Sequence, residues 1–136
     1  MRIQLGIIVL LWSFTAAMSA GTNWPTEGDP KASGISKDPT YGVSEKNPVR
    51  VGQKDSGPKA ETAYLASLRG PKGETLEYKR QGSCCPFKTS NALVGGKALL
   101  DSYEVTYAGA EKPIIFYLDM YDYEQPLVPP GFTKAP

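Results

Sequence analysis

Two runs rich in β-branched and aromatic residues dominate the last third of this 136-residue chain and restrict what it can fold into. Residues 99–107 and 113–121 flank the sequence Ala-Gly-Ala-Glu-Lys, which is short enough to join neighbouring antiparallel strands. Each run has one apolar and aromatic face, formed by Leu99, Tyr103, Val105 and Tyr107 in the first and by Ile114, Phe116, Leu118 and Met120 in the second. We therefore predict a β-hairpin whose two apolar faces meet in the core.

Three shorter patterns before the hairpin complete the predicted domain. Residues 47–52 resemble a short edge strand, with Pro48 near its start, where no backbone donor is needed. A helix is expected to begin at Pro58 and to be capped by Gly70. Residues 75–81 alternate between apolar and polar side chains, which predicts another strand. This order of elements predicts an α+β domain with one helix packed on a small antiparallel sheet of about three or four strands.

The N-terminal region has the composition of a secretory signal peptide. Arg2 gives a positive start, residues 3–14 are almost all apolar, and small residues lead to Ala20. The apolar run is shorter than the ~20 residues that span a bilayer, so we predict a cleaved signal peptide over residues 1–20. Cleavage after Ala17 is the alternative. The mature protein is therefore expected to be exported, to the periplasm or as a secreted protein.

The remaining chain divides by composition into an arm, a domain and a tail. Residues 21–46 are rich in Gly, Pro and Ser and poor in apolar side chains, so we predict a disordered arm. Residues 47–132 are sufficient for a single domain, and residues 133–136 are expected to form a tail.

The charge of the mature chain restricts its partners. Removal of residues 1–20 leaves 14 basic against 14 acidic residues, whereas a nucleic-acid-binding protein normally has a clear basic excess. We therefore expect no nucleic acid as a partner. No cysteine comes directly after either predicted cleavage site, so any membrane association is not expected to use a lipidated cysteine.

The most unusual motif is Gly-Ser-Cys-Cys-Pro-Phe at residues 82–87, which contains both cysteines of the chain. In an oxidising compartment each cysteine has only the other as an intramolecular partner, so we predict a Cys84–Cys85 disulfide. Neighbouring Cα atoms are ~3.8 Å apart across a trans peptide, below the usual ~4.4–6.8 Å, so the ring must distort its peptide bond or adopt the cis form. The alternative is two reduced thiols buried behind Phe87 as small apolar side chains.

The cysteines and the residues around them form the candidate binding site. The segment from Lys46 to Lys97 contains ten basic and four acidic residues, and a basic patch of Lys79, Arg80 and Lys88 would suit an anion. The alternative is that the acidic last third of the chain neutralises this charge. The candidate binding residues are Lys79, Arg80, Ser83, Cys84, Cys85, Phe87 and Lys88.

Several kinds of chemistry are excluded or unsupported by the sequence. The chain has no histidine, which excludes Ser-His-Asp and Cys-His catalysis and histidine zinc sites. A carboxylate pair that acts in acid/base catalysis or binds a cation could be formed among Asp101, Glu104, Asp119, Asp122 and Glu124. The favoured interpretation of these acids is a solvated polar sheet face. We assign no catalytic residue and expect no cofactor.

Three stretches carry a resemblance to a known family. Tyr-Lys-Arg-Gln-Gly-Ser-Cys-Cys-Pro-Phe at residues 78–87, together with residues 99–107 and 112–122, resembles a family of small exported bacterial proteins, many of them lipoproteins of unknown function. The resemblance covers about residues 47–132. Members are sometimes labelled 2-dehydro-3-deoxyphosphooctonate aldolase, but enzymes of that name use a barrel of typically ~250 residues, more than twice the length of this mature chain.

These observations leave three functional hypotheses. The first is a non-catalytic cell-envelope protein that binds a partner protein or a small envelope component through the cysteine loop and the adjoining sheet face. The second is a thiol-redox or soft-metal function of Cys84 and Cys85, whose thiolates suit Cu(I) or Zn(II). The third is the aldolase activity that the family label implies.

Overall fold

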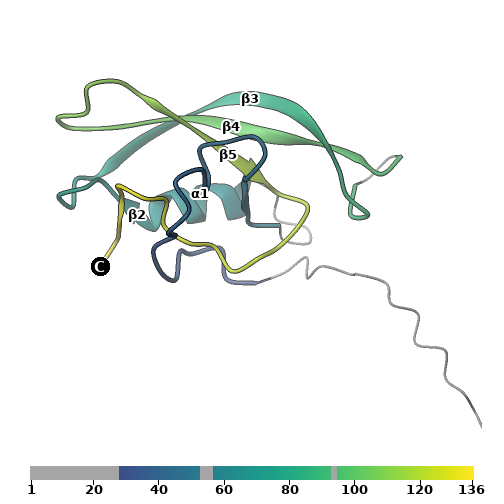
Figure 1. Ribbon diagram of the computed structural model, residues 1–136, viewed down its shortest axis with the longest axis horizontal. Coiled ribbons are helices and arrows are strands. Elements are labelled where there is room, and N and C mark those ends of the chain that lie inside the picture. Colours follow the sequence, from purple (N-terminus) through teal and green to yellow (C-terminus); the bar gives the residue numbers. More distant parts are fainter. Residues whose placement is uncertain (1–27, 53–56, 93–94) are drawn as a thin grey trace, which may run out of the picture.

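A four-stranded sheet arched over a single helix forms the centre of the protein (Figure 1). The computed structural model describes residues 28–52, 57–92 and 95–136. The elements are β1 (Val49–Arg50), α1 (Pro58–Ala66), β2 (Leu68–Arg69), β3 (Leu76–Lys88), β4 (Lys97–Tyr107), β5 (Ile114–Asp119) and β6 (Thr133–Lys134). The predicted α+β class, with one helix on a small sheet, is confirmed. No helix within the described ranges is long and apolar enough to cross a membrane, and the predicted signal peptide lies outside them.

The sheet has the strand order β1-β5-β4-β3, and β2 pairs with β6 in a separate two-stranded sheet. The predicted hairpin is confirmed, because β4 and β5 pair antiparallel with Tyr103 opposite Phe116 and Val105 opposite Ile114. At the far edge β1 runs parallel to β5, so the sheet is mixed rather than wholly antiparallel. Parallel pairing is possible because α1, β3 and β4 intervene between the two strands and provide the long connection that it requires.

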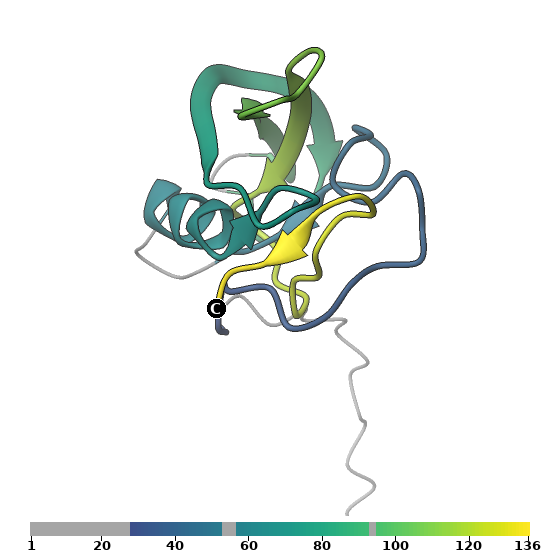
Figure 2. The ribbon, with the colours of Figure 1, turned by 90° about the vertical axis from the view of Figure 1, so that its left-hand side faces the viewer.

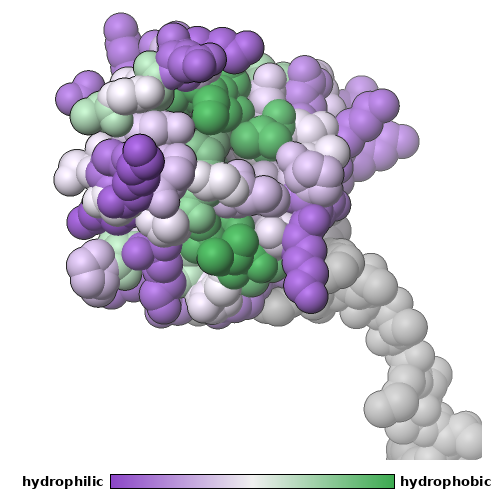
Figure 3. Space-filling model, turned by 60° about the vertical axis from the view of Figure 1, so that its left-hand side comes forward, coloured by the Kyte–Doolittle hydropathy of each residue, from purple (hydrophilic) through white to green (hydrophobic). Residues whose placement is uncertain are grey.

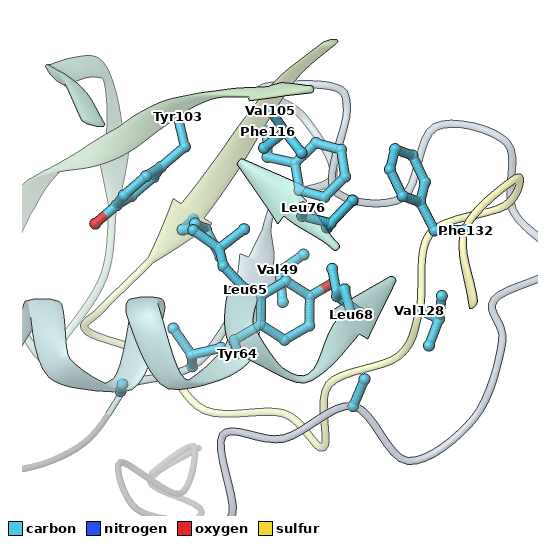
Figure 4. Close-up of a cluster of buried hydrophobic side chains, with 14 residues drawn as sticks. Val49, Tyr64, Leu65, Leu68, Leu76, Tyr103, Val105, Phe116, Val128 and Phe132 are labelled. Carbon is cyan, nitrogen blue, oxygen red and sulfur yellow. The ribbon is translucent and has the colours of Figure 1, made fainter. Parts of the chain in front are cut away.

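The hydrophobic core lies between α1 and the sheet. Tyr64 and Leu65 of α1 and Val105 and Phe116 of the hairpin are all almost completely buried (Figure 4). The Phe116 ring packs edge-on against Phe132 with centroids 5.1 Å apart. The predicted apolar faces of the hairpin therefore meet in the core, except at Leu99 and at Met120, which is half-buried and does not pack against the core cluster. Leu99 is 43% exposed, because the opposite face of β4 is the covered one at this end, and its neighbour Leu100 is buried instead.

The C-terminal end of the predicted helix is wrong. The helix ends at Ala66, and the chain then extends into β2, whose partner β6 lies in the segment that we expected to be a tail (Figure 2). The extended backbone carries Leu68 into the core, where it is fully buried. Gly70 is therefore not a helix cap, and its N–H donates to the Glu74 carbonyl at 2.8 Å in the following turn.

The predicted disordered arm is also wrong for residues 28–46, which pack along the C-terminal segment, whereas residues 21–27 lie outside the described part of the chain. Ile35 forms a parallel bridge with Val128, and the Ser36 N–H donates to the Val128 carbonyl at 2.8 Å. Tyr41 and Val43 pack against the core. Two proline-rich segments therefore satisfy each other's backbone groups without regular strands, which composition alone did not reveal.

Gly52 lies where the chain leaving β1 touches the turn after β5. Its N–H donates to the Asp122 carbonyl at 2.8 Å, and a Cβ atom at Gly52 would lie 2.6 Å from that carbonyl oxygen and from the carbonyl carbon of Tyr121. Because both contacts are backbone atoms, Gly52→Ala is expected to lower the free energy of unfolding by about 1–3 kcal/mol in urea denaturation.

Gly34→Ala is the matched control for this substitution. A Cβ at Gly34 would touch only the Leu127 side chain, at 3.9 Å, so we expect a change within about 0.5 kcal/mol. Equal effects of the two substitutions would show that the close approach at Gly52 is not a constraint on the fold.

Candidate functional site

The two cysteines lie inside β3, the edge strand of the sheet, rather than in a loop after it. The pairing of β3 with β4 is irregular between Arg80 and Gly82 and again between Cys84 and Pro86, so Cys85 has no partner on β4. Such bulges bend a strand and redirect its side chains. The strand therefore continues through the motif with one extra residue at each irregularity.

Cys84 and Cys85 form a disulfide, as predicted, with their Cα atoms 3.7 Å apart. The described residues contain no cis peptide bond, so the expected cis alternative is not adopted. Cys85 instead has a φ of 57°, and it is the single non-glycine residue with positive φ in the described ranges. This left-handed backbone costs roughly 1–2 kcal/mol for a residue with a Cβ atom. Such outliers are concentrated at functional sites.

The disulfide predicts a simple result in the mature protein. Alkylation of unreduced, denatured protein followed by intact-mass analysis should label no thiol, and reduction before alkylation should label two. Two labelled thiols without reduction would show that the cysteines are free in the native protein. A dimeric mass that disappears on reduction would indicate a bond between two chains instead.

The predicted basic patch does not form. Lys79 lies opposite Glu104 and Arg80 opposite Tyr103, and successive side chains of a strand point to opposite faces of the sheet. Lys88 lies at the far end of β3. The three cations therefore do not converge, because the alternation of the strand separates Lys79 from Arg80.

Arg80 and Ser83 bind a buried carboxylate on the helix side of the sheet. The Arg80 Nε and Nη2 donate to the two carboxylate oxygens of Asp101 at 3.0 and 2.9 Å, and the Ser83 hydroxyl donates to Asp101 Oδ1 at 2.9 Å. Asp101 is only 1% exposed. These two candidate residues therefore stabilise a buried carboxylate, and both oxygens of that carboxylate already accept hydrogen bonds.

A buried acid of the helix extends this cluster. Glu61 lies in the first turn of α1, is fully buried, and accepts a hydrogen bond from the Tyr103 hydroxyl at 2.8 Å. Burial raises the pKa of Glu61 to about 8, and the carboxylate of Asp101 adds to this shift through its charge and as an acceptor for the protonated form. At neutral pH the Glu61 carboxyl is therefore mostly protonated.

On the opposite face of the sheet, an open cavity of about 530 Å³ borders the disulfide. Val49 and Leu118 point into the core, so their neighbours Arg50 and Asp119 point to the other face. We call this space the disulfide cavity. It is lined by Glu45, Lys46, Pro48, Arg50, Cys85, Pro86, Phe87, Lys88, Leu100, Asp119 and Asp122. Three of the seven candidate residues, Cys85, Phe87 and Lys88, therefore line one cavity.

Asp119 is the buried acid of the disulfide cavity, with 1% of its surface exposed. Its Oδ1 accepts the N–H groups of Tyr121 and Asp122 at 2.7 and 3.1 Å, whereas its buried Oδ2 has no hydrogen-bond partner among the described residues. Burial raises the pKa of Asp119 to about 6; the two N–H donors and Arg50 oppose this shift and the charge of Asp122 adds to it. Asp119 therefore has one carboxylate oxygen that the described residues leave unsatisfied.

Asp122 connects the turn after β5 to the end of β3. Its Oδ1 accepts hydrogen bonds from the Thr89 hydroxyl at 2.5 Å and from the Asn91 side-chain amide at 2.9 Å. The Phe87 ring packs edge-on against Tyr121, with centroids 6.1 Å apart. These contacts fix the disulfide strand and the acidic turn relative to each other across the cavity.

The favoured sequence interpretation of these acids as a solvated face is wrong for Asp101 and Asp119, since both are buried. Sequence reasoning also missed Lys46, Pro48 and Arg50, because they lie far from the cysteines in the chain. The one available signal was Asp119 itself, since an Asp that is followed by a turn commonly accepts the N–H two residues on.

The described residues contain no group of three or more Cys, Asp or Glu side chains that could hold a metal ion.

A second hollow of about 780 Å³ lies between α1 and the chain end, and Ala63, Ser67, Arg69 and Lys134 are among the residues that line it. None of the residues lining this second hollow has a side-chain polar atom that is both buried and unsatisfied.

Comparison of the chain with protein-family models, curated proteins and solved structures found no match.

Proposed function

We propose that this protein is an exported, non-catalytic binding protein of the cell envelope that takes a small molecule into the disulfide cavity. The observation that supports this most strongly is the cavity itself, whose volume falls within the ~300–1,000 Å³ typical of small-molecule sites. It combines apolar side chains with a few polar groups. Cys85, Phe87 and Leu100 provide apolar contact, and Asp119 provides an acceptor at depth.

The face that Figure 3 shows does not favour a protein partner. The large apolar side chains that are exposed among the described residues are Ile35, Tyr78, Leu99 and Ile115, at 61%, 37%, 43% and 36% exposure. They come from four separate parts of the chain, and the face in Figure 3 shows apolar side chains in two patches divided by more polar ones. A stable protein interface usually has a continuous apolar centre, which this face does not offer.

Affinity selection from a small-molecule extract of the cell envelope tests the proposal. The mature protein, freed of bound molecules by dialysis, should retain at least one compound that mass spectrometry detects after denaturation. Lys88→Trp, which fills the cavity from its exposed edge, should abolish retention. Lys79→Trp is the matched control, since Lys79 is exposed on the same strand and does not line the cavity.

Equal retention by the wild type and Lys88→Trp would place binding elsewhere. Retention no greater than that of heat-denatured protein would contradict the binding function.

A thiol-redox function is the second candidate. Cys84 and Cys85 are half-buried on an edge strand, and disulfides that reagents can reach are reduced more easily than fully buried ones. A redox function predicts that excess reduced glutathione opens the ring, yielding two protein thiols and glutathione disulfide. Persistence of the ring in that buffer, measured by alkylation, would contradict a redox function and leave the binding function unaffected.

A further inference from the structure

The disulfide cavity contains an acceptor that nothing in the described protein satisfies. Asp119 Oδ2 is buried and without a partner, whereas its other oxygen accepts two backbone N–H groups. A buried charged oxygen without a hydrogen bond is unfavourable, and native proteins seldom leave one without a reason. Asp119 lines the open cavity, so a bound molecule that reaches its Oδ2 would have to bring a hydrogen-bond donor.

The charges of the cavity are arranged by depth. Glu45, Lys46 and Lys88 are exposed, so their charges lie at the edge of the cavity. Arg50 is partly buried, and its Nη1 is paired with Glu124 Oε2 at 3.1 Å. The remaining charged residues of the lining are Asp119 and Asp122, which are buried and half-buried. The deeper part of the cavity therefore contains two carboxylates and one guanidinium that is already paired with Glu124, although the whole lining is balanced in charge.

We propose that the disulfide cavity binds the ammonium group of an organic amine at Asp119, with the carbon part of the amine packed against Cys85, Phe87 and Leu100. This inference rests on the proposed binding function and specifies its ligand class. An ammonium group supplies three donors and a positive charge in a compact head, which suits one unsatisfied carboxylate oxygen beside a second carboxylate. A divalent metal ion would need more oxygen ligands than these two residues provide.

Three probes that differ in head group alone test the ligand class. Hexylammonium, hexan-1-ol and hexanoate have the same apolar chain, and isothermal titration calorimetry at pH 7.5 with the unreduced mature protein compares their affinities. Hexylammonium should bind at least about tenfold more tightly than hexan-1-ol, because only the ammonium adds a positive charge to the hydrogen bond with the Asp119 carboxylate. Hexanoate should bind most weakly, because its carboxylate would face Asp119 and Asp122.

Asp119→Asn should reduce the affinity for hexylammonium at least about tenfold and reduce that for hexan-1-ol much less, because the alcohol loses no ion pair. Glu111→Gln is the matched control, since it removes one negative charge from an exposed turn outside the cavity. It should change neither affinity by more than about twofold. Thermal unfolding of both variants verifies that they are folded.

The wild-type protein gives an independent readout through pH. The charged groups that line the cavity with Asp119 are Asp122 in the same turn, Arg50 on β1, Glu45 and Lys46 before β1, and Lys88 on β3. The pKa of Asp119 lies near 6, and hexylammonium stays charged throughout this range. Its affinity should therefore fall by up to about tenfold per pH unit below pH 6 and level off above it, whereas the affinity for hexan-1-ol should change much less.

The outcomes separate the ligand class from the binding function. If hexan-1-ol or hexanoate binds as tightly as hexylammonium and Lys88→Trp abolishes that binding, the cavity binds small molecules but the ammonium assignment is wrong. Equal loss of hexylammonium binding in Asp119→Asn and Glu111→Gln would also overturn it, since the effect would then be one of net charge. Absence of hexylammonium binding at millimolar concentration contradicts the inference, while envelope-extract selection decides separately whether the cavity has another ligand.

Discussion

Between about pH 4.5 and pH 8 the free energy of unfolding is expected to fall as the pH rises, and Glu61→Gln should remove most of this dependence. Glu61 has its ordinary pKa of 4.5 when the chain unfolds and a pKa of about 8 when it is buried. The folded protein therefore binds more protons than the unfolded chain throughout this window, and the stability conferred by the protonated group is lost as the pH rises through 8.

The expected slope from this one group is about 1.4 kcal/mol per pH unit, which amounts to roughly 4 kcal/mol across the window. Asp119 adds a slope of the same sign between 3.8 and about 6, because its pKa is also raised on folding. The range from pH 6 to pH 8 therefore reports mainly on Glu61. Gln has the same shape as protonated Glu61 and can still accept the Tyr103 hydroxyl.

Urea denaturation at half-unit pH intervals measures this dependence in the wild type and in Glu61→Gln. The wild type should lose stability steadily from pH 6 to pH 8, and the variant should be nearly constant over that range. A wild type whose stability is as constant as that of the variant over this range would show that Glu61 is already ionised in the folded protein at pH 6. The buried cluster of Glu61, Tyr103, Asp101 and Arg80 would then carry one more negative charge than it does with a protonated Glu61.

Arg80→Met should destabilise the protein by about 2–3 kcal/mol, because it leaves the carboxylate of Asp101 buried without its cation. Asp101 is 1% exposed and accepts two hydrogen bonds from Arg80, whereas the Arg80 side chain is 45% exposed. Partial access of water from the Arg80 side limits the loss to less than that of a fully buried pair. Methionine retains the aliphatic stem, so packing changes little.

Lys79→Met is the control for this substitution, since Lys79 is the exposed neighbour on the same strand and points to the other face. Its effect should stay within about 0.5 kcal/mol. Asp101→Asn in the Arg80→Met background should recover part of the lost stability, because it removes the unpaired charge. Equal effects of Arg80→Met and Lys79→Met in thermal or urea unfolding would show that the ion pair contributes nothing to the fold.

The elements that were predictable from sequence are those whose pattern is local. The hairpin of β4 and β5 follows from two alternating runs around a short turn, and all of that information lies within about 25 residues of the chain. The parallel direction of the pairing between β1 and β5 was not predictable. It depends on the path of the long connection between the two strands, which no local pattern describes. β6 has two residues and no pattern of its own.

The path of β3 shows where the alternation rule fails. Residues 75–81 follow a period of two, but the bulges after Arg80 and Cys84 each insert a residue, so the period changes inside the strand. The cysteines then appear in the sequence to follow a strand that in fact continues to Lys88. Alternation could still have shown that Lys79 and Arg80 point to opposite faces of the sheet, since both precede the first bulge.

The cavity was the least predictable feature. Its disulfide side was identified through the rarity of adjacent cysteines, whereas its other side comes from Lys46, Pro48 and Arg50, nearly 40 residues earlier in the chain. Asp119 has a residue type that is usually solvated, and its burial depends on the turn with Tyr121 and Asp122. Composition describes surfaces on average and cannot identify the one acid that a turn encloses.

The central claim is that a small molecule binds beside the vicinal disulfide, and chemical-shift mapping tests it most directly. Spectra of the ¹⁵N-labelled, unreduced mature protein should be recorded with a fragment library of amines, alcohols and carboxylates. Binding fragments are expected to shift the amide signals of Cys85, Lys88 and Asp119. Shifts that gather instead at Ala63, Arg69 and Lys134 around the second hollow, or a library without any binding fragment, would contradict the claim.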